Sequence, residues 1–182
     1  KPSKENPKKL FNLTDLQGYI TSKYSGWSAD KVLNVAQSLY EKKFLSYPRT
    51  SSRYLESTLL SKMEKVLDAV KGEFSVKFED KKSVFDSSKV ESHSALTPTY
   101  IVPSNLSGDE SIIYEEVKKR FISQFMEPAE FELTEIKTLV DNHLFLTKGK
   151  LLVKEGWKVL YSSSKNDDIE DGEECNRIPD IL

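Results

Sequence analysis

Apolar side chains recur at helical spacing over the first part of the chain. Residues 14–17 (TDLQ) have the Ser/Thr-x-x-Glu/Gln form of a capping box, which predicts a helix from there to about Tyr24. After a turn at 26–28, Ser28 can cap a second helix, whose apolar face is formed by Val32, Leu33, Val35, Ala36, Leu39, Tyr40 and Phe44. Two short helices followed by an extended segment are typical of a helix-turn-helix or winged-helix arrangement, although an ordinary helical hairpin is commoner.

Two further helices are predicted before the pattern changes. Residues 57–71 place their apolar side chains on one helical face, and Gly72 favours a stop directly after them. An irregular stretch follows. Asp109 is then expected to cap a fourth helix that continues to about Met126, with Pro128 ending it.

Beyond Pro128 the period changes from helical to alternating. Residues 130–140 alternate apolar and polar side chains, as a half-buried strand does. Residues 143–147 and 151–153 are predicted to form two more strands, separated by a turn at Gly149. The change of period indicates a domain boundary near Pro128.

These patterns predict an α+β chain with a mostly helical, winged-helix-like (CAP-like) domain and a small antiparallel β portion. The expected divisions are a flexible lead-in over 1–9, the helical domain over 10–128, a β-rich segment over 129–164 and an acidic linker over 165–182.

Composition excludes several classes of protein without indicating a function. With 27 basic and 29 acidic residues the net charge is −2, which does not by itself indicate nucleic-acid binding. No apolar run approaches the length of a membrane span, and none follows the lysine-rich N-terminus as in a secretory signal. Cys175 is the only cysteine, which excludes an internal disulfide and favours the reducing cytoplasm.

Metal and nucleotide sites are poorly supported. A single cysteine excludes a cysteine-based zinc site, and the acidic tail over 165–182 lacks the spacing of a calcium loop. The chain has no glycine-rich phosphate loop, which argues against a nucleotide-driven enzyme. We therefore expect no metal and no ATP to be bound by these residues.

The strongest chemical signal is the run Tyr47-Pro48-Arg49-Thr50, within 45–55 (LSYPRTSSRYL). Tyr47 and Arg49 are two residues apart, so in an extended segment both side chains leave the same face. Pro48 fixes its own φ and biases Tyr47 toward extended geometry. A phenol can attack a phosphodiester, and a guanidinium can hold the phosphate or lower the pKa of the phenol. Taken alone, however, the four residues are more typical of a strand end with a surface arginine.

Other polar side chains could assist such chemistry. Thr50, Ser51 and Ser52 offer hydroxyl donors, and Arg53 offers a second guanidinium. For Ser51 and Ser52 the favoured interpretation is capping of the helix that follows. His93 could donate a hydrogen bond to a phosphate, although a lone histidine in a loop is usually solvated.

Taken together and in order, these motifs resemble the type IA DNA topoisomerases, most closely the bacterial topoisomerase III branch. The segments that carry the resemblance are 10–17 (LFNLTDLQ), 36–50 (AQSLYEKKFLSYPRT), 88–99 (SKVESHSALTPT), Arg120-Phe121 with Phe125, and 149–157 (GKLLVKEGW). They cover nearly the whole chain, and five ordered matches are far more specific than any one of them.

The resemblance implies a role for each candidate residue. Tyr47 would attack a phosphodiester of single-stranded DNA and hold the 5′ end as a phosphotyrosine, with strand passage and religation following without ATP. Arg49 matches the arginine that engages the scissile phosphate, and His93 matches the histidine that contacts phosphate. The further candidates for binding DNA or phosphate are Thr50, Arg53 and Lys89.

The resemblance also implies a longer protein. The Toprim domain of the family, with its catalytic glutamate and lysine, lies outside these residues, so Mg²⁺ is expected in the full-length enzyme but on a domain absent from this chain. Residues 1–182 alone are therefore expected to be inactive. The expected partner is single-stranded DNA, with RNA left open, and the expected state is a monomer in the cytoplasm, associated with the nucleoid and not with a membrane.

Two other functions remain open at this point. The chain could be a non-catalytic winged-helix DNA-binding module, in which Tyr47 stacks on bases or packs against its neighbours. It could also be an interaction domain with no nucleic-acid role, which only the nearly neutral charge favours.

Overall fold

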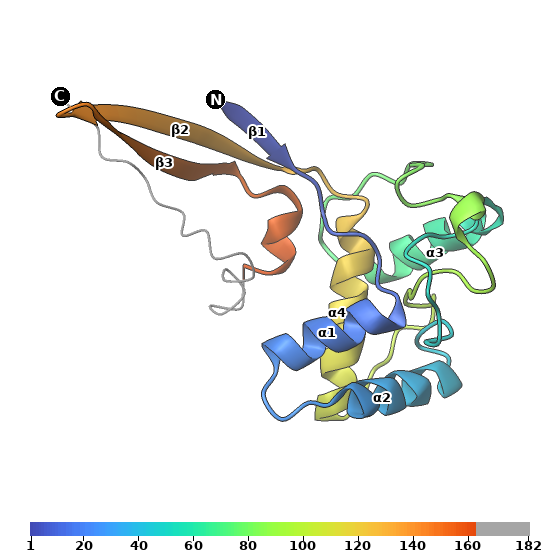
Figure 1. Cartoon of the computed structure of the whole chain (residues 1–182). Helices are drawn as coiled ribbons and strands as arrows, with labels where there is room; N and C mark the ends of the chain where they lie inside the picture. The colour runs from blue at the N-terminus through green and yellow to red at the C-terminus, as the bar shows by residue number, and fades with distance from the viewer. Residues whose placement is uncertain (163–182) are drawn as a thin grey trace. The chain divides into compact units, whose positions relative to one another are not determined.

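A computed structural model describes residues 1–162, and these fall into two compact units (Figure 1). One unit is Lys8–Met126, and the other combines Lys1–Pro7 with the chain from Glu127 onward. The acidic linker expected over 165–182, with Cys175, lies outside the described residues. Both helices and antiparallel strands are present, which confirms the α+β class.

The helical unit holds four helices and two short 3-10 turns. These are α1 (Leu13–Lys23), α2 (Ala29–Glu41), η1 (Ser57–Leu59), α3 (Leu60–Val70), η2 (Ser87–Lys89) and α4 (Gly108–Ser123). The helix predicted over 57–71 thus begins with a 3-10 turn, and a positive φ of 55° at Gly72 follows its end, as expected for a glycine stop. Within residues 8–126, all of which are described, strand pairing amounts to two single bridges.

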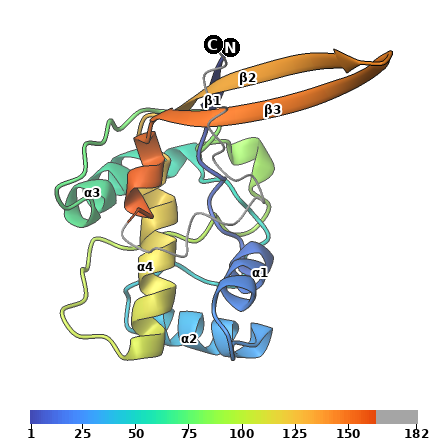
Figure 2. The same cartoon turned by 90° about the vertical axis from the view of Figure 1, so that its left-hand side faces the viewer.

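The core of this unit lies between α1, α2 and α4 (Figure 2). Residues of α4 at helical spacing, among them Ile113, Val117 and Phe121, are almost completely removed from solvent. Buried residues that share a cluster with α4 are Phe11, Leu16, Ile20, Val32, Ala36, Leu39, Leu45 and Leu96. Removing such side chains from water is the main favourable term in folding, so the core anchors the backbone at Leu45, two residues before Tyr47.

Of the caps predicted for α1, α2 and α4, only that of α2 is confirmed. Ser28 does cap α2, accepting a hydrogen bond from the Lys31 amide at 3.2 Å. The cap of α1 is Asn12, whose Oδ1 accepts from the Asp15 amide at 2.7 Å, so the helix begins before the box predicted at 14–17. The cap of α4 is Ser107 in place of Asp109, and Glu110 completes a capping box with it.

The second unit is a three-stranded antiparallel sheet in the order β1–β2–β3, from β1 (Pro2–Glu5), β2 (Ala129–Val140) and β3 (His143–Lys154). The lead-in over 1–9, expected to be flexible, therefore contains a strand, because its backbone pairs with Ala129–Glu132. Local composition carries no sign of that pairing, since the partner is more than 120 residues away in sequence.

The predicted break at Gly149 is absent from the described hairpin. β3 is continuous, and Gly149 lies inside it, opposite Thr134. The turn is instead at Asp141 and Asn142, whose positive φ values of 45° and 65° are typical of a two-residue type I′ hairpin turn. The 3-10 turn η3 (Gly156–Leu160) follows β3.

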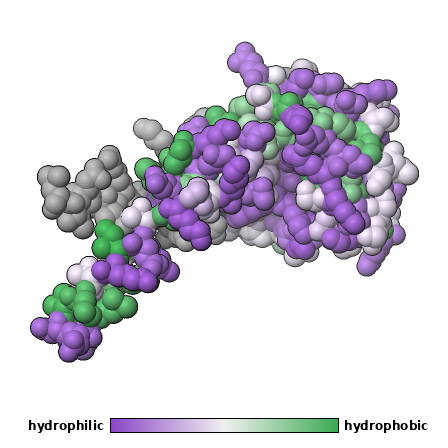
Figure 3. Space-filling model, turned by 90° about the horizontal axis from the view of Figure 1, so that it is seen from above, coloured by the Kyte–Doolittle hydropathy of each residue, from purple (hydrophilic) through white to green (hydrophobic). Residues whose placement is uncertain are grey.

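Apolar side chains are exposed on the hairpin, most of all near its turn (Figure 3). Leu139, Leu144 and Phe145 are each more than half exposed. Within residues 1–162, the apolar side chains near the turn of the hairpin are therefore not covered. Over the same residues, no helix is both long enough and apolar enough to cross a bilayer.

Candidate active site

The segment that carries Tyr47 begins at a tight helix end. Lys43 adopts a left-handed conformation (φ 66°) directly after α2. The Phe44 amide donates to the Leu39 carbonyl at 2.9 Å and the Lys43 amide to the Tyr40 carbonyl at 2.9 Å, which together form a Schellman motif. Glycine usually occupies this position, so a lysine there does not predict that the helix stops. The chain leaves α2 in a fixed direction toward Tyr47.

Residues before Tyr47 are paired with a second extended segment that follows His93. Leu45 forms an antiparallel bridge with Pro98, and the Ser46 amide donates to the Thr97 carbonyl at 2.9 Å. The Ser46 hydroxyl accepts from the Thr97 amide at 3.0 Å. The two segments that carry the tyrosine and the histidine are therefore joined by backbone as well as side-chain hydrogen bonds.

The backbone bends directly after Tyr47. The Thr50 amide donates to the Pro48 carbonyl at 2.9 Å, which closes a three-residue γ-turn centred on Arg49. Beyond the bend, the Leu13 amide donates to the Thr50 carbonyl at 3.1 Å. Tyr47 and Arg49 are thus not on one straight extended face, and the expectation drawn from their spacing is wrong in that detail.

The Tyr47 ring lies between two other rings. Its centroid is 4.7 Å from that of His93, with 54° between the planes, and 5.3 Å from that of Tyr40, with an edge-on angle of 74°. Tyr47 is half-buried and His93 is exposed. Tyr40, expected on the buried face of its helix, is 40% exposed and contacts Tyr47 instead. The phenol thus keeps solvent access while its ring is restrained on two sides.

The Arg49 guanidinium is not paired with any carboxylate of the described residues. The side chain is exposed, and among the described residues it has no hydrogen bond either. The guanidinium of Arg49 can therefore approach an anion without first breaking an ion pair, and its planar donors suit bidentate contact with phosphate.

Thr50 is almost completely buried and joins the two segments through its side chain. The Thr50 hydroxyl donates to the main-chain carbonyl of His93 at 2.8 Å and accepts from the Ser52 amide at 3.1 Å. These bonds use the hydroxyl within the fold. Thr50 thus positions the histidine segment, and its hydroxyl is not aimed at solvent.

Arg53 forms an ion pair with Asp15 in the first turn of α1. Both its Nε and its Nη2 donate to that carboxylate, the latter at 2.8 Å from Oδ1. The hydrogen bonds from Arg53 hold the pKa of Asp15 below its usual value. Asn12 adds a link from its Nδ2 to the Ser51 carbonyl at 3.0 Å. The loop after Tyr47 is therefore fastened to the start of α1.

Ser52 does not cap the following helix as expected. Its hydroxyl donates at 3.1 Å to the carbonyls of Tyr54 and Lys89 and accepts from the Tyr54 amide at 3.0 Å. The cap position of η1 is Glu56, which makes no side-chain cap bond. Ser52 thus holds the loop that carries Lys89 against the segment that carries Tyr47.

Tyr54 was not singled out by sequence reasoning, yet two lysines converge on it. Lys9 and Lys89 both donate to its hydroxyl, Lys89 at 3.4 Å. These hydrogen bonds, that from Lys9 first, hold the pKa of Tyr54 below its usual value. The only signal in the sequence is a tyrosine beside Arg53, so the cluster could not have been found without the fold.

The structure thus brings together three of the six candidates, namely Tyr47, Thr50 and His93, and Arg49 follows Tyr47 by two residues. Arg53 and Lys89 lie on the loops that follow and are held by Asp15 and by Asp86 with Tyr54. A half-exposed phenol beside an imidazole, with an unpaired guanidinium two residues away in the sequence, supplies the groups needed to bind and attack a phosphate ester.

A divalent metal does not fit the described residues. Over 1–162 no three histidine, cysteine, aspartate or glutamate side chains are grouped so that they could hold one. No step below is therefore routed through a metal on these residues.

The comparisons with known proteins agree on one family. The family model described as DNA topoisomerase matches residues 1–181. A Bacillus cereus protein named DNA topoisomerase 3 is 35% identical, in a match that covers 94% of this chain and 25% of that protein. A Staphylococcus haemolyticus protein of the same name is 34% identical, in a match that covers 91% of this chain and 25% of the relative. The chain spans about a quarter of the length of these curated relatives.

A solved structure is also similar. Full-length topoisomerase I from Thermotoga maritima matches with a TM-score of 0.61 and 24% sequence identity, over 97% of this chain and 30% of that one. At this identity the likeness bears on the fold alone, and it agrees with the α+β class.

Proposed function

Because this chain belongs to the type IA DNA topoisomerases, we propose that Tyr47 is the nucleophile that cleaves a single strand of DNA. The observation that supports this most is the position of Tyr47, half-exposed against His93 and two residues from the free guanidinium of Arg49. No other tyrosine in the described residues combines these neighbours.

The proposed step is an exchange of phosphoesters. The Tyr47 oxygen attacks the phosphorus of a DNA linkage, a bond from that oxygen to phosphorus forms, and the bond from phosphorus to the 3′ oxygen breaks. The phenol proton is lost and the leaving 3′ oxygen gains a proton, so the 5′ end stays on the protein as a phosphotyrosine. Religation is the reverse, and no ATP is needed because the ester energy is conserved.

Arg49 and His93 are the groups that would stabilise the charge on the phosphate. A guanidinium placed where negative charge develops is worth more in the transition state than in the ground state. His93 offers a ring nitrogen beside the phenol, with 4.7 Å between the two ring centroids, close enough for contact with the same phosphate. Thr50 acts through His93 as a positioning residue.

The remaining candidates would act on the strand beside the cleaved bond. Lys89 is exposed, and Arg53 is about half exposed while it is paired with Asp15. Their charges would attract the backbone of a single strand even without direct contact to the scissile phosphate. RNA would meet the same groups, since none of them reads the 2′ position.

Residues 1–182 supply, on this proposal, only part of the catalytic machinery. The chain spans a quarter of its relatives, and its described residues lack a group of metal ligands. We expect Mg²⁺ and the remaining acid–base groups to be held elsewhere in the full-length enzyme. The purified 182-residue chain should therefore fail to relax negatively supercoiled DNA with Mg²⁺ present, and relaxation by that chain would overturn the division of roles.

A non-catalytic DNA-binding module is the second candidate. It is favoured by the ring of Tyr40 beside Tyr47, because neighbouring aromatic rings can stack on bases. The two functions are distinguished by whether a covalent protein–DNA adduct forms. The proposed enzyme links covalently to DNA through Tyr47, whereas a binding module releases its DNA fully when the protein is denatured.

A further inference from the structure

Two ammonium groups converge on the partly exposed phenol of Tyr54, which is not among the residues that contact Tyr47. The Nζ atoms of Lys9 and Lys89 each lie 4.6 Å from the centroid of the Tyr54 ring, and both reach its hydroxyl. Lys9 comes from the chain before α1 and Lys89 from η2, so residues 80 positions apart meet at this point. Like charges at one oxygen repel, unless an anion lies between them.

The carboxylates near this cluster leave an excess of positive charge. The Asp86 Oδ2 atom is 3.5 Å from Lys89 Nζ, and the Asp15 carboxylate forms an ion pair with Arg53. Lys9 has no carboxylate partner among the described residues. The lowered pKa of Tyr54 shows the same imbalance, because the lysines favour negative charge on the oxygen they share. An external anion would satisfy both ammonium groups at once.

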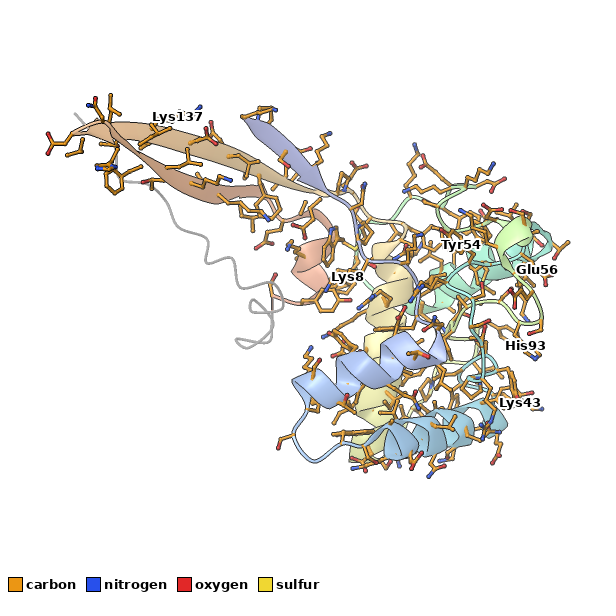
Figure 4. The ribbon with its side chains drawn as sticks, in the orientation of Figure 1. Lys8, Lys43, Tyr54, Glu56, His93 and Lys137 are labelled. Atoms are coloured by element: carbon orange, nitrogen blue, oxygen red, sulfur yellow. The ribbon has the colours of Figure 1, made fainter. Side chains whose placement is uncertain are left out.

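The cluster is attached to the Tyr47 group by the backbone. The Tyr54 carbonyl accepts a hydrogen bond at 2.9 Å from the Ala95 amide, two residues after His93. Tyr54 follows Tyr47 by seven residues, a span of at most about 25 Å even when fully extended. Figure 4 shows Tyr54 and His93 on the same side of the helical unit. A strand bound at Tyr47 can therefore reach Tyr54 within a few nucleotides.

We propose that Lys9, Tyr54 and Lys89 form a second binding site, which takes one backbone phosphate of the single strand a few nucleotides from the bond that Tyr47 cleaves. The two ammonium groups contact the phosphate oxygens, and the Tyr54 hydroxyl, between them, donates a hydrogen bond to the same phosphate. This inference rests on the proposed function, since it takes the ligand to be nucleic acid.

Binding at this site is tested by salt dependence in the full-length enzyme carrying Tyr47→Phe, so that no cleavage disturbs the equilibrium. Affinity for a labelled oligothymidylate is measured by fluorescence anisotropy from low to high NaCl. Each phosphate contact on a single strand contributes about 0.7 to the slope of log affinity against log salt. Because the site takes one phosphate, the double change Lys9→Gln/Lys89→Gln should flatten the slope by about 0.7, which is about 5-fold in affinity for each decade of salt.

The matched control is Lys62→Gln/Lys65→Gln, which removes two exposed lysine charges from α3 of the same unit. Its slope should stay near that of the parent, which is the full-length enzyme carrying Tyr47→Phe alone.

A second measurement locates the phosphate with oligonucleotides that carry a neutral methylphosphonate at one linkage. At one position the substitution should weaken DNA binding by the parent and leave binding by Lys9→Gln/Lys89→Gln unaffected. A double variant that keeps the control's slope and the parent's response at every linkage overturns the proposal.

The two proposals fail in different ways. If wild-type enzyme forms an adduct at Tyr47 but Lys9→Gln/Lys89→Gln binds like the control, the second site is wrong and the nucleophile stands. If Lys9→Gln/Lys89→Gln flattens the salt slope as expected but no adduct forms at Tyr47 in the wild-type enzyme, the phosphate site stands and the nucleophile is wrong.

Discussion

The hydroxyl of Thr50 donates a 2.8 Å hydrogen bond to the main-chain carbonyl of His93. This bond joins a segment that begins after α2 to one that lies more than 40 residues later, at a point where no strand ladder connects them. It is shielded from water, because Thr50 is almost completely buried. The close contact between the Tyr47 and His93 rings therefore depends on a buried side chain.

Replacing Thr50 with valine should destabilise the fold and disturb the site. The methyl group fills the place of the hydroxyl, but the His93 carbonyl and the Ser52 amide both lose a partner. We expect a loss of about 1–3 kcal/mol in the free energy of unfolding, measured by urea titration. Thr50→Ser keeps the hydroxyl and should recover most of the loss. Equal stability of the valine variant and wild type would contradict this role.

Arg49 should matter more for cleavage than for binding. Arg49→Ala in the full-length enzyme is expected to slow adduct formation by about 10²–10³, as for the loss of one donor to a developing charge. Arg49→Lys keeps the charge but loses the planar, bidentate donors, so its rate of adduct formation should fall between those of wild type and Arg49→Ala. Lys62→Ala serves as the control. If Arg49→Ala weakens binding and cleavage by the same factor, the arginine only holds the DNA.

Glu110 should make the helical unit sensitive to acid. Hydrogen bonds from Lys42 above all, and from Ser38 and the Ser107 amide, lower the pKa of Glu110 to about 2, against a partial opposing effect of burial. A carboxylate whose pKa is lowered by folding stabilises the fold above its unfolded value of 4.5, and that stability is lost as the pH falls toward 2.

The matching experiment compares thermal unfolding of wild type and Glu110→Gln from pH 7 to pH 2.5. Wild type should be the more stable protein above pH 5, and the difference should shrink as the pH approaches 2. Glu64→Gln, which removes an exposed carboxylate from α3, should show no such convergence. A difference that is independent of pH would mean that the charge of Glu110 contributes nothing.

Lys43 carries backbone strain directly before the Tyr47 segment. Its φ of 66° costs a side chain roughly 1–2 kcal/mol, part of which glycine avoids. Lys43→Gly should therefore raise the free energy of unfolding by up to about 1 kcal/mol. Lys43→Val, with a branched side chain in the same conformation, should lower it. Chemical denaturation of both variants checks the sign, and a stabilising valine would contradict the left-handed assignment.

Local sequence patterns were sufficient for most of the elements. The apolar periodicity of α2 and α3 and the alternation of β2 predicted the type of each element, because burial of one face dictates the spacing. The features that were predicted wrongly, the flexible lead-in and the break at Gly149, depend on pairing with residues elsewhere in the chain. β1 forms only because Ala129–Glu132 pairs with it, and Gly149 remains in a strand because β2 lies opposite.

The candidate site shows the same division. Tyr47, Arg49 and His93 could be named from the sequence through their motifs, and the resemblance gave their family. The neighbours of these residues could not be named. Tyr40 fits a buried helical face as well as an exposed one, and Tyr54 gains its two lysines only through the fold.

The most direct test of the account is covalent capture of DNA by Tyr47. The full-length enzyme is incubated with a single-stranded oligonucleotide, denatured and digested, and the labelled peptide is sequenced. An oligonucleotide labelled at its 3′ end should transfer its label to the peptide that contains Tyr47, whereas a 5′ label should be released, and Tyr47→Phe should give no labelled peptide while it still binds DNA. Undiminished transfer to Tyr47→Phe, or a label found on Tyr54 or another residue, would contradict the account.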